Sequence, residues 1–387
     1  MLTSIQKWRS EHPYAFRLLL AIILVIIGGA LRVYFIQHSM DDWDEDEYII
    51  ASKDFREIYD SGEWGDISNV EFNSEHPPLV KMLFALTLDK QEFDQIPENY
   101  FPGTRADPPL PRKSLENARY QSAVFGILTI FIVGWISPLA GMVLVFHTLF
   151  LRFTTAAYLD ALPTFFSALA VICYTRTRLP TFSKTKDGKQ LVSQFSNTYW
   201  FLSAACMGIA VAAKYPYGLI AIVVAAHALY SRYHPAKIML WGLTSLAFFF
   251  IFNPYIWPDP ITRIEEQLTY HQEYAERNGG QHNYMKPFEQ LVTPRQLRHR
   301  NADFPFLAFQ LFEVAVLGLA VIGVVVLVRH KAVVGWWLIV GMVFLILWST
   351  QWVQHKMMIM VPYSFAAAAG FQWIRQKIIL YRQRAAS

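Results

Sequence analysis

Residues 18–48 read LLLAIILVIIGGALRVYFIQHSMDDWDEDEY, an apolar run that leads directly into a cluster of carboxylates. The apolar part, 18–36, is close to the ~20 residues that an α-helix needs to cross a bilayer. No small-residue cleavage site follows it. Arg32 and the acidic stretch follow instead, so we interpret the run as a retained signal anchor. The sequence therefore predicts a membrane protein whose first helix carries an acidic segment to one membrane surface.

Similar apolar runs recur along the whole chain. Its 387 residues are 54% hydrophobic and 17% charged, which is unusual for a soluble domain. The two cysteines, Cys173 and Cys206, lie inside apolar runs and are interpreted as small buried hydrophobes. The predicted spans are 18–36, 121–136, 139–151, 161–174, 199–213, 217–230, 238–257, 304–328, 333–348 and 357–374. The expected fold is an all-α polytopic membrane protein, one domain over residues 1–387, with about ten transmembrane helices.

Lysine and arginine recur on one side of these spans. They occur before the first span, in alternate loops and in the C-terminal tail, at Lys7, Arg9, Arg17, Arg176, Arg178, Lys184, Lys186, Lys189, Arg232, Lys237, Arg329, Lys331, Arg375, Lys377, Arg382 and Arg384. The positive-inside rule makes this side cytoplasmic. Two long loops, 38–116 and 258–303, are then external, and interfacial helices are expected in the first. The basic residues do not gather on one polar element with interleaved aromatics, so nucleic acid is not an expected partner.

Two motifs in the first external loop could carry chemistry. The first is the acidic segment Asp41–Tyr48, which is either a solvated turn that keeps the loop external or the source of a general base. The second is 75–81, EHPPLVK, in which two prolines fix the backbone before an amphipathic segment. It is either a stiff turn or a rigid element that directs His76 and Lys81 toward an anionic group.

The order of these motifs resembles that of a known superfamily. Asp44-Glu45 with Tyr48 at its spacing, followed by His76-Pro77-Pro78-Leu79, is similar to the Asp-Glu-x-x-Tyr and H/K-P-P-L motifs of the protein O-mannosyltransferase and aminoarabinose transferase superfamily. These are membrane glycosyltransferases of the GT-C fold. The resemblance continues through 117–126, Arg152 with Asp160, 214–218 (KYPYG), 253–260 (NPYIWPDP) and 355–362. It implies an inverting transfer of a sugar from a polyprenyl- or dolichyl-phosphate donor to an acceptor hydroxyl on the external face.

The resemblance also implies roles for individual residues. Asp44 is the expected catalytic base and Glu45 its catalytic neighbour, with Asp46 as the runner-up because it lacks the tyrosine spacing. The residues expected to bind substrate are Tyr48, His76, Lys81, Arg119, Asp160, Lys214, Arg263 and Lys356. Lys214 interrupts an apolar stretch and either contacts the donor phosphate or snorkels to the interface. No cofactor is expected beyond the lipid-linked donor. A divalent ion shared by Asp44, Glu45 and Asp160 is conceivable but not favoured.

Two other classes of function stay open. One is a transporter, which intramembrane carboxylates along a path would support, and the other is an assembly subunit whose external loops bind a partner. An enzyme requires Asp44, Asp160, Lys214 and Lys356 to cluster in space, whereas a scaffold does not. The expected setting is the plasma membrane of a prokaryote, with membrane lipid, the lipid-phosphate sugar and an acceptor glycan, lipid or protein as partners.

Overall fold

The computed structural model describes residues 11–42, 44–93, 110–185, 188–278, 282–294, 297 and 305–386. The positions of Lys7, Arg9 and Lys186, and the first residue of the span predicted at 304–328, lie outside these ranges. The α-helices are α2 (Pro13–His38), α3 (Glu45–Ser61), α4 (Leu79–Ala85), α5 (Lys90–Phe93), α6 (Arg112–Ile136), α7 (Pro138–Phe146), α8 (Thr148–Phe153), α9 (Ala161–Arg176), α10 (Asn197–Ala213), α11 (Gly218–Tyr230), α12 (Pro235–Ile251), α13 (Pro260–Asn278), α14 (Lys286–Gln290), α15 (Phe306–Arg329), α16 (Val333–Leu347) and α17 (Met357–Ala386). The 3-10 turns are η1 (Trp64–Ser68), η2 (Tyr215–Tyr217), η3 (Pro254–Ile256) and η5 (Val353–Lys356).

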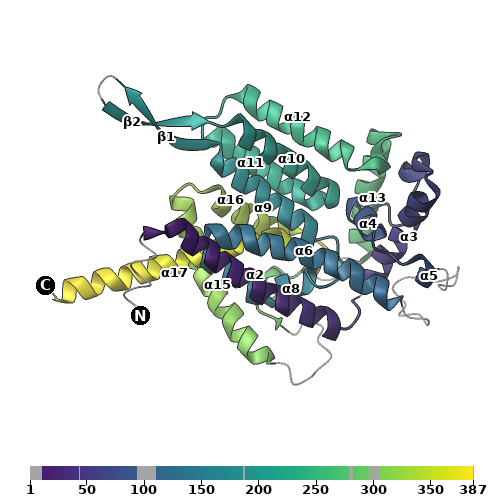
Figure 1. The fold of residues 1–387 in the computed structure, drawn as a ribbon, viewed down its shortest axis with the longest axis horizontal. Helices are drawn as coiled ribbons and strands as arrows, with labels where there is room; N and C mark the ends of the chain where they lie inside the picture. The colour runs from purple at the N-terminus through teal and green to yellow at the C-terminus, as the bar shows by residue number, and fades with distance from the viewer. Residues whose placement is uncertain are drawn as a thin grey trace.

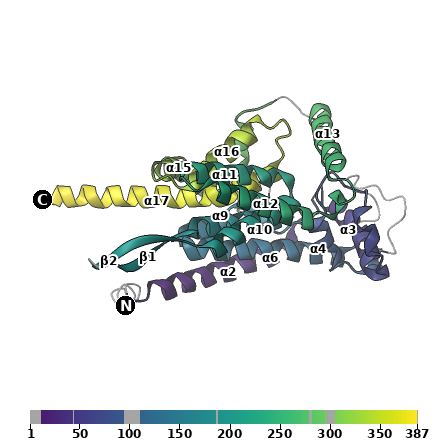
Figure 2. The same cartoon turned by 90° about the horizontal axis from the view of Figure 1, so that it is seen from above.

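The long helices form a bundle with two chemically different ends. Figure 2 shows both termini and the β-hairpin at one end, and α3, α4 and α13 at the other. Figure 1 shows α13 beside α3 and α4 at this second end, although some 200 residues separate them in the chain. The described helices α3, α4 and α13 of the two loops that were predicted to be external therefore lie together at the end opposite the termini.

The predicted spans are borne out in part. Among the residues that the structure describes, four helical segments are long and apolar enough to cross a membrane: Pro13–His38, Arg112–Ile136, Phe306–Arg329 and Val353–Ala385. Five others are apolar but shorter, at Ala161–Arg176, Asn197–Ala213, Tyr215–Tyr230, Pro235–Ile251 and Val333–Leu347. The span predicted at 139–151 is wrong as one helix, because the backbone leaves the helical conformation at His147 and α7 and α8 are separate.

Small residues allow the helices to approach closely. A Cβ atom added at Gly323 of α15 would clash with the Ala366 carbonyl of α17, and one at Gly370 of α17 would clash with the Leu319 carbonyl. Apolar side chains gain little by leaving lipid for another apolar surface, so close backbone packing is a main source of helix association in membranes. The last helix is therefore fixed along α15.

One feature departs from the all-α expectation. Strands β1 (Arg178–Thr185) and β2 (Gly188–Phe195) form an antiparallel hairpin, from the Arg178–Phe195 pair to the Thr185–Gly188 pair. The hairpin joins α9 to α10 at the end of the molecule that carries the termini (Figure 2). The sequence analysis identified this loop only by its basic residues.

Candidate active site

The acidic segment forms the start of α3. Asp44 occupies the N-cap position, and Glu45, Asp46 and Glu47 make up the first turn. Carboxylates are favoured there because the unpaired N–H groups give a helix N-terminus a partial positive charge. The segment follows directly on the first long helix, α2, so it is held at the end of the bundle away from the termini.

Glu45 is completely buried, and its carboxylate accepts four hydrogen bonds. The Arg119 guanidinium donates to it from Nε at 2.7 Å and from Nη2 at 2.5 Å. The backbone N–H groups of Ala157 and Asp42 donate at 2.7 Å each. With both oxygens engaged, this carboxylate can neither accept a substrate proton easily nor bind an ion. The geometry gives Glu45 a positioning role beside Asp44.

A second arginine neutralises another acid of the segment. Arg152 of α8 holds Asp42 in a bidentate pair, with distances of 2.8 Å and 2.9 Å. Arg119 also reaches Asp41 at 3.4 Å and the Met40 carbonyl at 3.2 Å. Bidentate arginine–carboxylate pairs fix geometry as well as charge. The two arginines thus anchor the chain on the N-terminal side of Asp44.

Asp44 itself has a different environment. Its carboxylate accepts a hydrogen bond from the Gln354 side-chain amide at 3.2 Å, and among the described residues it forms no ion pair within 4 Å. Burial raises the pKa of Asp44 to about 6. The Asp42 and Asp160 carboxylates add to that increase, whereas Lys214 and Arg152 oppose it. Asp44 is therefore a half-buried carboxylate that titrates just below neutral pH.

A buried ion pair faces this carboxylate. Lys214 donates to both oxygens of Asp160, at 2.8 Å and 2.7 Å. Asp160 precedes α9 and Lys214 ends α10, so the side-by-side packing of these two helices brings the residues together. An ammonium group has three N–H donors, and Asp160 uses two. One donor of Lys214 is left to contact a further anion.

Aromatic and histidine rings surround these groups. The Tyr48 ring makes edge-to-face contacts with His76 and with Tyr158, both at 5.8 Å between centroids. The ring centroids of His76 and His271 of α13 are 5.6 Å apart. The Nε2 atom of His271 lies 3.1 Å from the Glu75 carbonyl oxygen. Burial lowers the pKa of His76 well below its usual range, and the positive groups around it add to the effect. His76 is therefore neutral near pH 7 and adds no positive charge.

Three of the predicted substrate-binding cations instead bind backbone carbonyls. Lys81 donates to Asn73 at 2.5 Å and to His76 at 3.0 Å. Arg263 of α13 donates to the Tyr255 carbonyl at 2.5 Å and to the Ser68 carbonyl. Lys356 donates to Trp352 at 2.8 Å. These three residues fix the turns that carry His76, α13 and Gln354.

The structure thus brings together Asp44, Tyr48, His76, Asp160 and Lys214 out of the expected set. The sequence motifs assigned no role to Gln354, Tyr158 or His271. Helix α13 folds back over residues 68–76 and half-buries the His271 ring. Proximity to the 253–260 and 355–362 motifs was the available signal for His271 and Gln354.

The structure does not bring Asp44, Glu45 and Asp160 together as a shared set of metal ligands. The oxygens of Glu45 are engaged by Arg119, Ala157 and Asp42, and Lys214 already lies on Asp160. Across the part of the chain that the structure describes, no group of three or more His, Cys, Asp or Glu side chains is arranged to hold a metal ion.

Comparison with known proteins rests on structure, since no family model and no curated protein matches the sequence. The fold is that of the GT-C membrane glycosyltransferases that use lipid-phosphate-linked sugars. The similar solved structures include ArnT from Cupriavidus metallidurans bound to undecaprenyl phosphate, with a TM-score of 0.57 and 12% identity over 96% of this chain. The structure of the same protein in the apo state gives a TM-score of 0.55 and 14% identity over 94% of this chain.

A second similar protein is the archaeal oligosaccharyltransferase AglB from Archaeoglobus fulgidus, solved with an inhibitory peptide and a dolichol-phosphate. It gives a TM-score of 0.53 and 11% identity over 97% of this chain. The chain spans 64% of the length of ArnT and 52% of that of AglB. The match covers nearly the whole of this chain, and it establishes the GT-C fold expected from the motifs.

Proposed function

We propose that the protein is an inverting glycosyltransferase that moves a sugar from a polyprenyl- or dolichyl-phosphate donor to an acceptor hydroxyl. The observation that carries the proposal is the state of Asp44. Glu45, Asp42 and Asp160 are held by Arg119, Arg152 and Lys214 respectively, whereas among the described residues the Asp44 carboxylate has only the Gln354 amide. An unpaired carboxylate that titrates near neutral pH is suited to general-base catalysis.

In the proposed reaction Asp44 accepts the proton of the acceptor hydroxyl. The acceptor oxygen forms a bond to the anomeric carbon of the sugar as the bond between that carbon and the phosphate oxygen breaks. The electron pair of the broken bond leaves with the polyprenyl phosphate, and attack from the opposite face inverts the anomeric centre. The free donor of Lys214 and the N–H groups of Arg152 outside its pair with Asp42 can stabilise the departing phosphate.

The fold comparisons support the substrate class. ArnT was solved with undecaprenyl phosphate and AglB with a dolichol-phosphate. A lipid-phosphate-linked sugar is therefore the donor class to test first. We infer that the site faces the non-cytoplasmic side, because the basic loops and the termini share the other end.

The transporter alternative has less support. Within the apolar parts of the described spanning helices the one acidic residue is Glu313 of α15. Its carboxylate accepts from the Thr148 N–H at 2.8 Å and from the Thr148 hydroxyl at 2.5 Å, which holds it against the start of α8. A single anchored carboxylate is not a series of sites along a permeation path.

The test is a transfer assay on the purified full chain with a panel of lipid-linked sugars. Asp44→Asn should lower turnover by ~10²–10⁴-fold while donor affinity stays close to normal, since the base acts only in the transition state. Lys214→Ala should lower both turnover and donor affinity. Asp46→Asn, two residues along the same helix, is the matched control and should be mild. A nearly active Asp44→Asn variant in a validated assay would refute the mechanism.

A further inference from the structure

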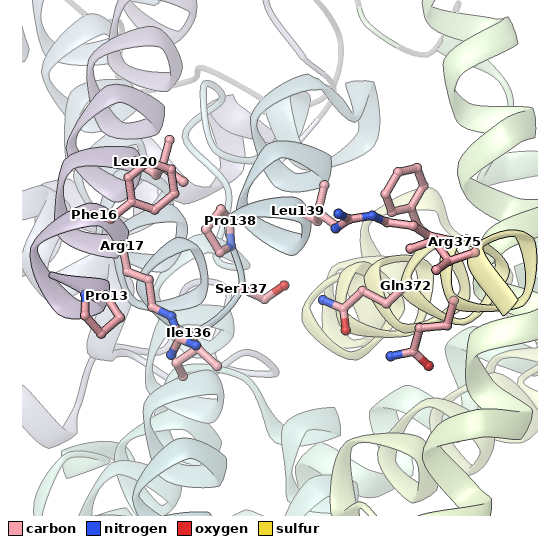
Figure 3. A pocket seen from close by; sticks show the side chains of 13 residues that line it. Pro13, Phe16, Arg17, Leu20, Ile136, Ser137, Pro138, Leu139, Gln372 and Arg375 are labelled. Atoms are coloured by element: carbon pink, nitrogen blue, oxygen red, sulfur yellow. The ribbon is translucent and has the colours of Figure 1, made fainter. Parts of the chain in front are cut away.

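A cavity lies at the opposite end of the molecule from Asp44. It has a volume of about 790 Å³ and opens between α2, the α6–α7 turn and α17 (Figure 3). Its lining residues are Pro13, Phe16, Arg17, Leu20, Ile136, Ser137, Pro138, Leu139, Phe371, Gln372, Arg375, Gln376 and Ile379. The cavity therefore lies between the first and last helices, where the bundle carries its termini.

The lining combines apolar walls with two guanidinium groups. Phe16, Leu20 and Leu139 provide hydrocarbon surface, and Figure 3 shows Arg17 on one side of the cavity and Arg375 on the other. Among the residues that the structure describes, no acidic side chain lines it. The neighbouring polar groups are a serine and two glutamines, which are uncharged. A ligand that fits must carry negative charge at one end and hydrocarbon at the other.

The cavity also lies at the level of a membrane surface. Arg17 is at the beginning of the apolar helix α2, and Arg375 follows the apolar part of α17. Tyr14, in the first turn of α2, is 76% exposed, and Trp373, two positions before Arg375 in α17, is 40% exposed. Aromatic and basic side chains at the ends of spans mark the lipid headgroup region. The two arginines are therefore at headgroup level, with the apolar walls beneath them.

We propose that this cavity binds an anionic glycerophospholipid of the leaflet on the side of the termini. The lipid phosphate lies between Arg17 and Arg375, and an acyl chain packs along Phe16, Leu20 and Leu139. Basic pockets between spanning helices on the cytoplasmic side are suited to anionic headgroups. Because α7 separates α2 from α17, the lipid joins the first and last helices in a way that direct contacts do not.

The site is distinct from the proposed catalytic centre. Helix α2 has 26 residues, so at 1.5 Å per residue its two ends are about 40 Å apart. The cavity involves the first turns of α2, and Asp44 follows its last turn. A donor lipid whose phosphate lies in this cavity could not present its sugar to Asp44.

The test measures lipid binding to the purified full chain by native mass spectrometry and by thermal shift. Phosphatidylglycerol should bind and raise the melting temperature, and phosphatidylcholine should not. Arg17→Gln/Arg375→Gln should weaken phosphatidylglycerol binding by about tenfold or more, because each arginine contributes to headgroup attraction. Arg329→Gln/Arg382→Gln removes the same charge outside the cavity and should leave binding unchanged. Leu20→Trp, which fills the cavity and keeps its charge, should also weaken binding.

Three outcomes overturn the proposal. The first is equal binding of phosphatidylcholine and phosphatidylglycerol, which would mean that the arginines do not select charge. Equal loss in both double variants would mean that only the net charge of this end matters. Loss of undecaprenyl phosphate binding, with phosphatidylglycerol unaffected, would make the cavity a carrier-lipid site. In the absence of added lipid, the Arg17→Gln/Arg375→Gln variant should melt at the same temperature as the wild type, which would show that its fold is intact.

Discussion

Asp44 and Asp46 lie two positions apart on one helix, but their surroundings differ. Asp46 accepts from the Glu47 N–H at 2.9 Å, within its own helical turn. Asp44 lies at the N-cap, near Lys214, Asp160 and Arg152, with its pKa raised to about 6. The difference arises because the helical turn directs neighbouring side chains away from each other. At the residue scale, the proposed site depends on which carboxylate forms no ion pair among the described residues.

The pH dependence of transfer follows from this pKa. Asp44 acts as a base only when it is ionised, so the initial rate at saturating donor should fall as the pH decreases through about 6. Glu47 also titrates in this range, since burial raises its pKa to about 7. Glu47→Gln is therefore the control and should keep the acidic limb. A limb centred near pH 4 in the wild type would contradict the environment described for Asp44.

Thermal stability should respond to the same group. The folded-state pKa of Asp44 is raised, so the folded protein binds a proton more tightly than the unfolded chain, and stability is lost as the pH increases from about 4 to 6. Asp44→Asn removes this loss. The variant should melt no lower than the wild type at pH 7.5, and its advantage should disappear at low pH. A clear decrease in melting temperature at pH 7.5 would show that Asp44 supports the fold.

The sequence singles out Asp44 as the candidate base, because its spacing to Tyr48 is local. It could not predict which acids would be neutralised. Glu45 meets Arg119 across 74 residues and Asp42 meets Arg152 across 110, so the pairing depends on helix packing. The same limit explains Lys81, Arg263 and Lys356. A cation in the sequence does not show whether its donors will meet a substrate or the carbonyls of a turn.

The start of α3 is secured to α6 and α8 by the two arginine pairs. Glu45→Ala would leave the buried Arg119 without its partner, and breaking a buried pair costs about 3–5 kcal/mol. We expect a large decrease in the free energy of unfolding in detergent. Lys113→Ala is the matched control. Lys113 lies on α6, the helix that carries Arg119, and it pairs with Asp89 at 2.6 Å in an exposed position. Exposed pairs contribute little to stability, so this change should leave the free energy of unfolding almost unchanged.

A double variant tests whether the expected loss of stability arises from leaving one buried charge unpaired. The double change Glu45→Leu with Arg119→Leu should lower the free energy of unfolding by less than the sum of the two single changes. The reason is that the double change removes both charges of the pair, whereas each single change leaves the other charge buried and unpaired. Additive losses would indicate that the two side chains are stabilised independently.

The helices were predictable to different degrees. Long apolar runs identified α2, α6, α15 and α17, because a bilayer requires a minimum length. The break between α7 and α8 was not predictable from hydropathy, since both sides of His147 are apolar and the break arises where the Thr148 N–H meets Glu313 of a distant helix. The hairpin was missed because charge, and not periodicity, was used to interpret that loop.

At the scale of the whole molecule, the separation of the two ends predicts the topology. The hairpin and the C-terminus share one end, and α3, against which η1 packs, lies at the other (Figure 2). A reporter inserted after Lys189 or fused after Arg384 should be cytoplasmic, and one near Asp66 should be external. The measurement is the activity of paired reporters that function on only one side of the membrane. A cytoplasmic reporter at Asp66 would move the proposed site to the wrong face.

The hydrogen bond from Gln354 to Asp44 has a consequence for biosynthesis. The two residues are 310 positions apart. A ribosome adding about 5–20 residues per second needs roughly 15–60 s to cover that distance. The arginine pairs and the Asp160–Lys214 pair can form early in that interval, as α2 to α10 enter the membrane. Gln354 arrives only just before the final helix, so a nascent or truncated chain presents Asp44 without its last neighbour. Asp44 therefore acquires its hydrogen bond from Gln354 only when translation is nearly complete.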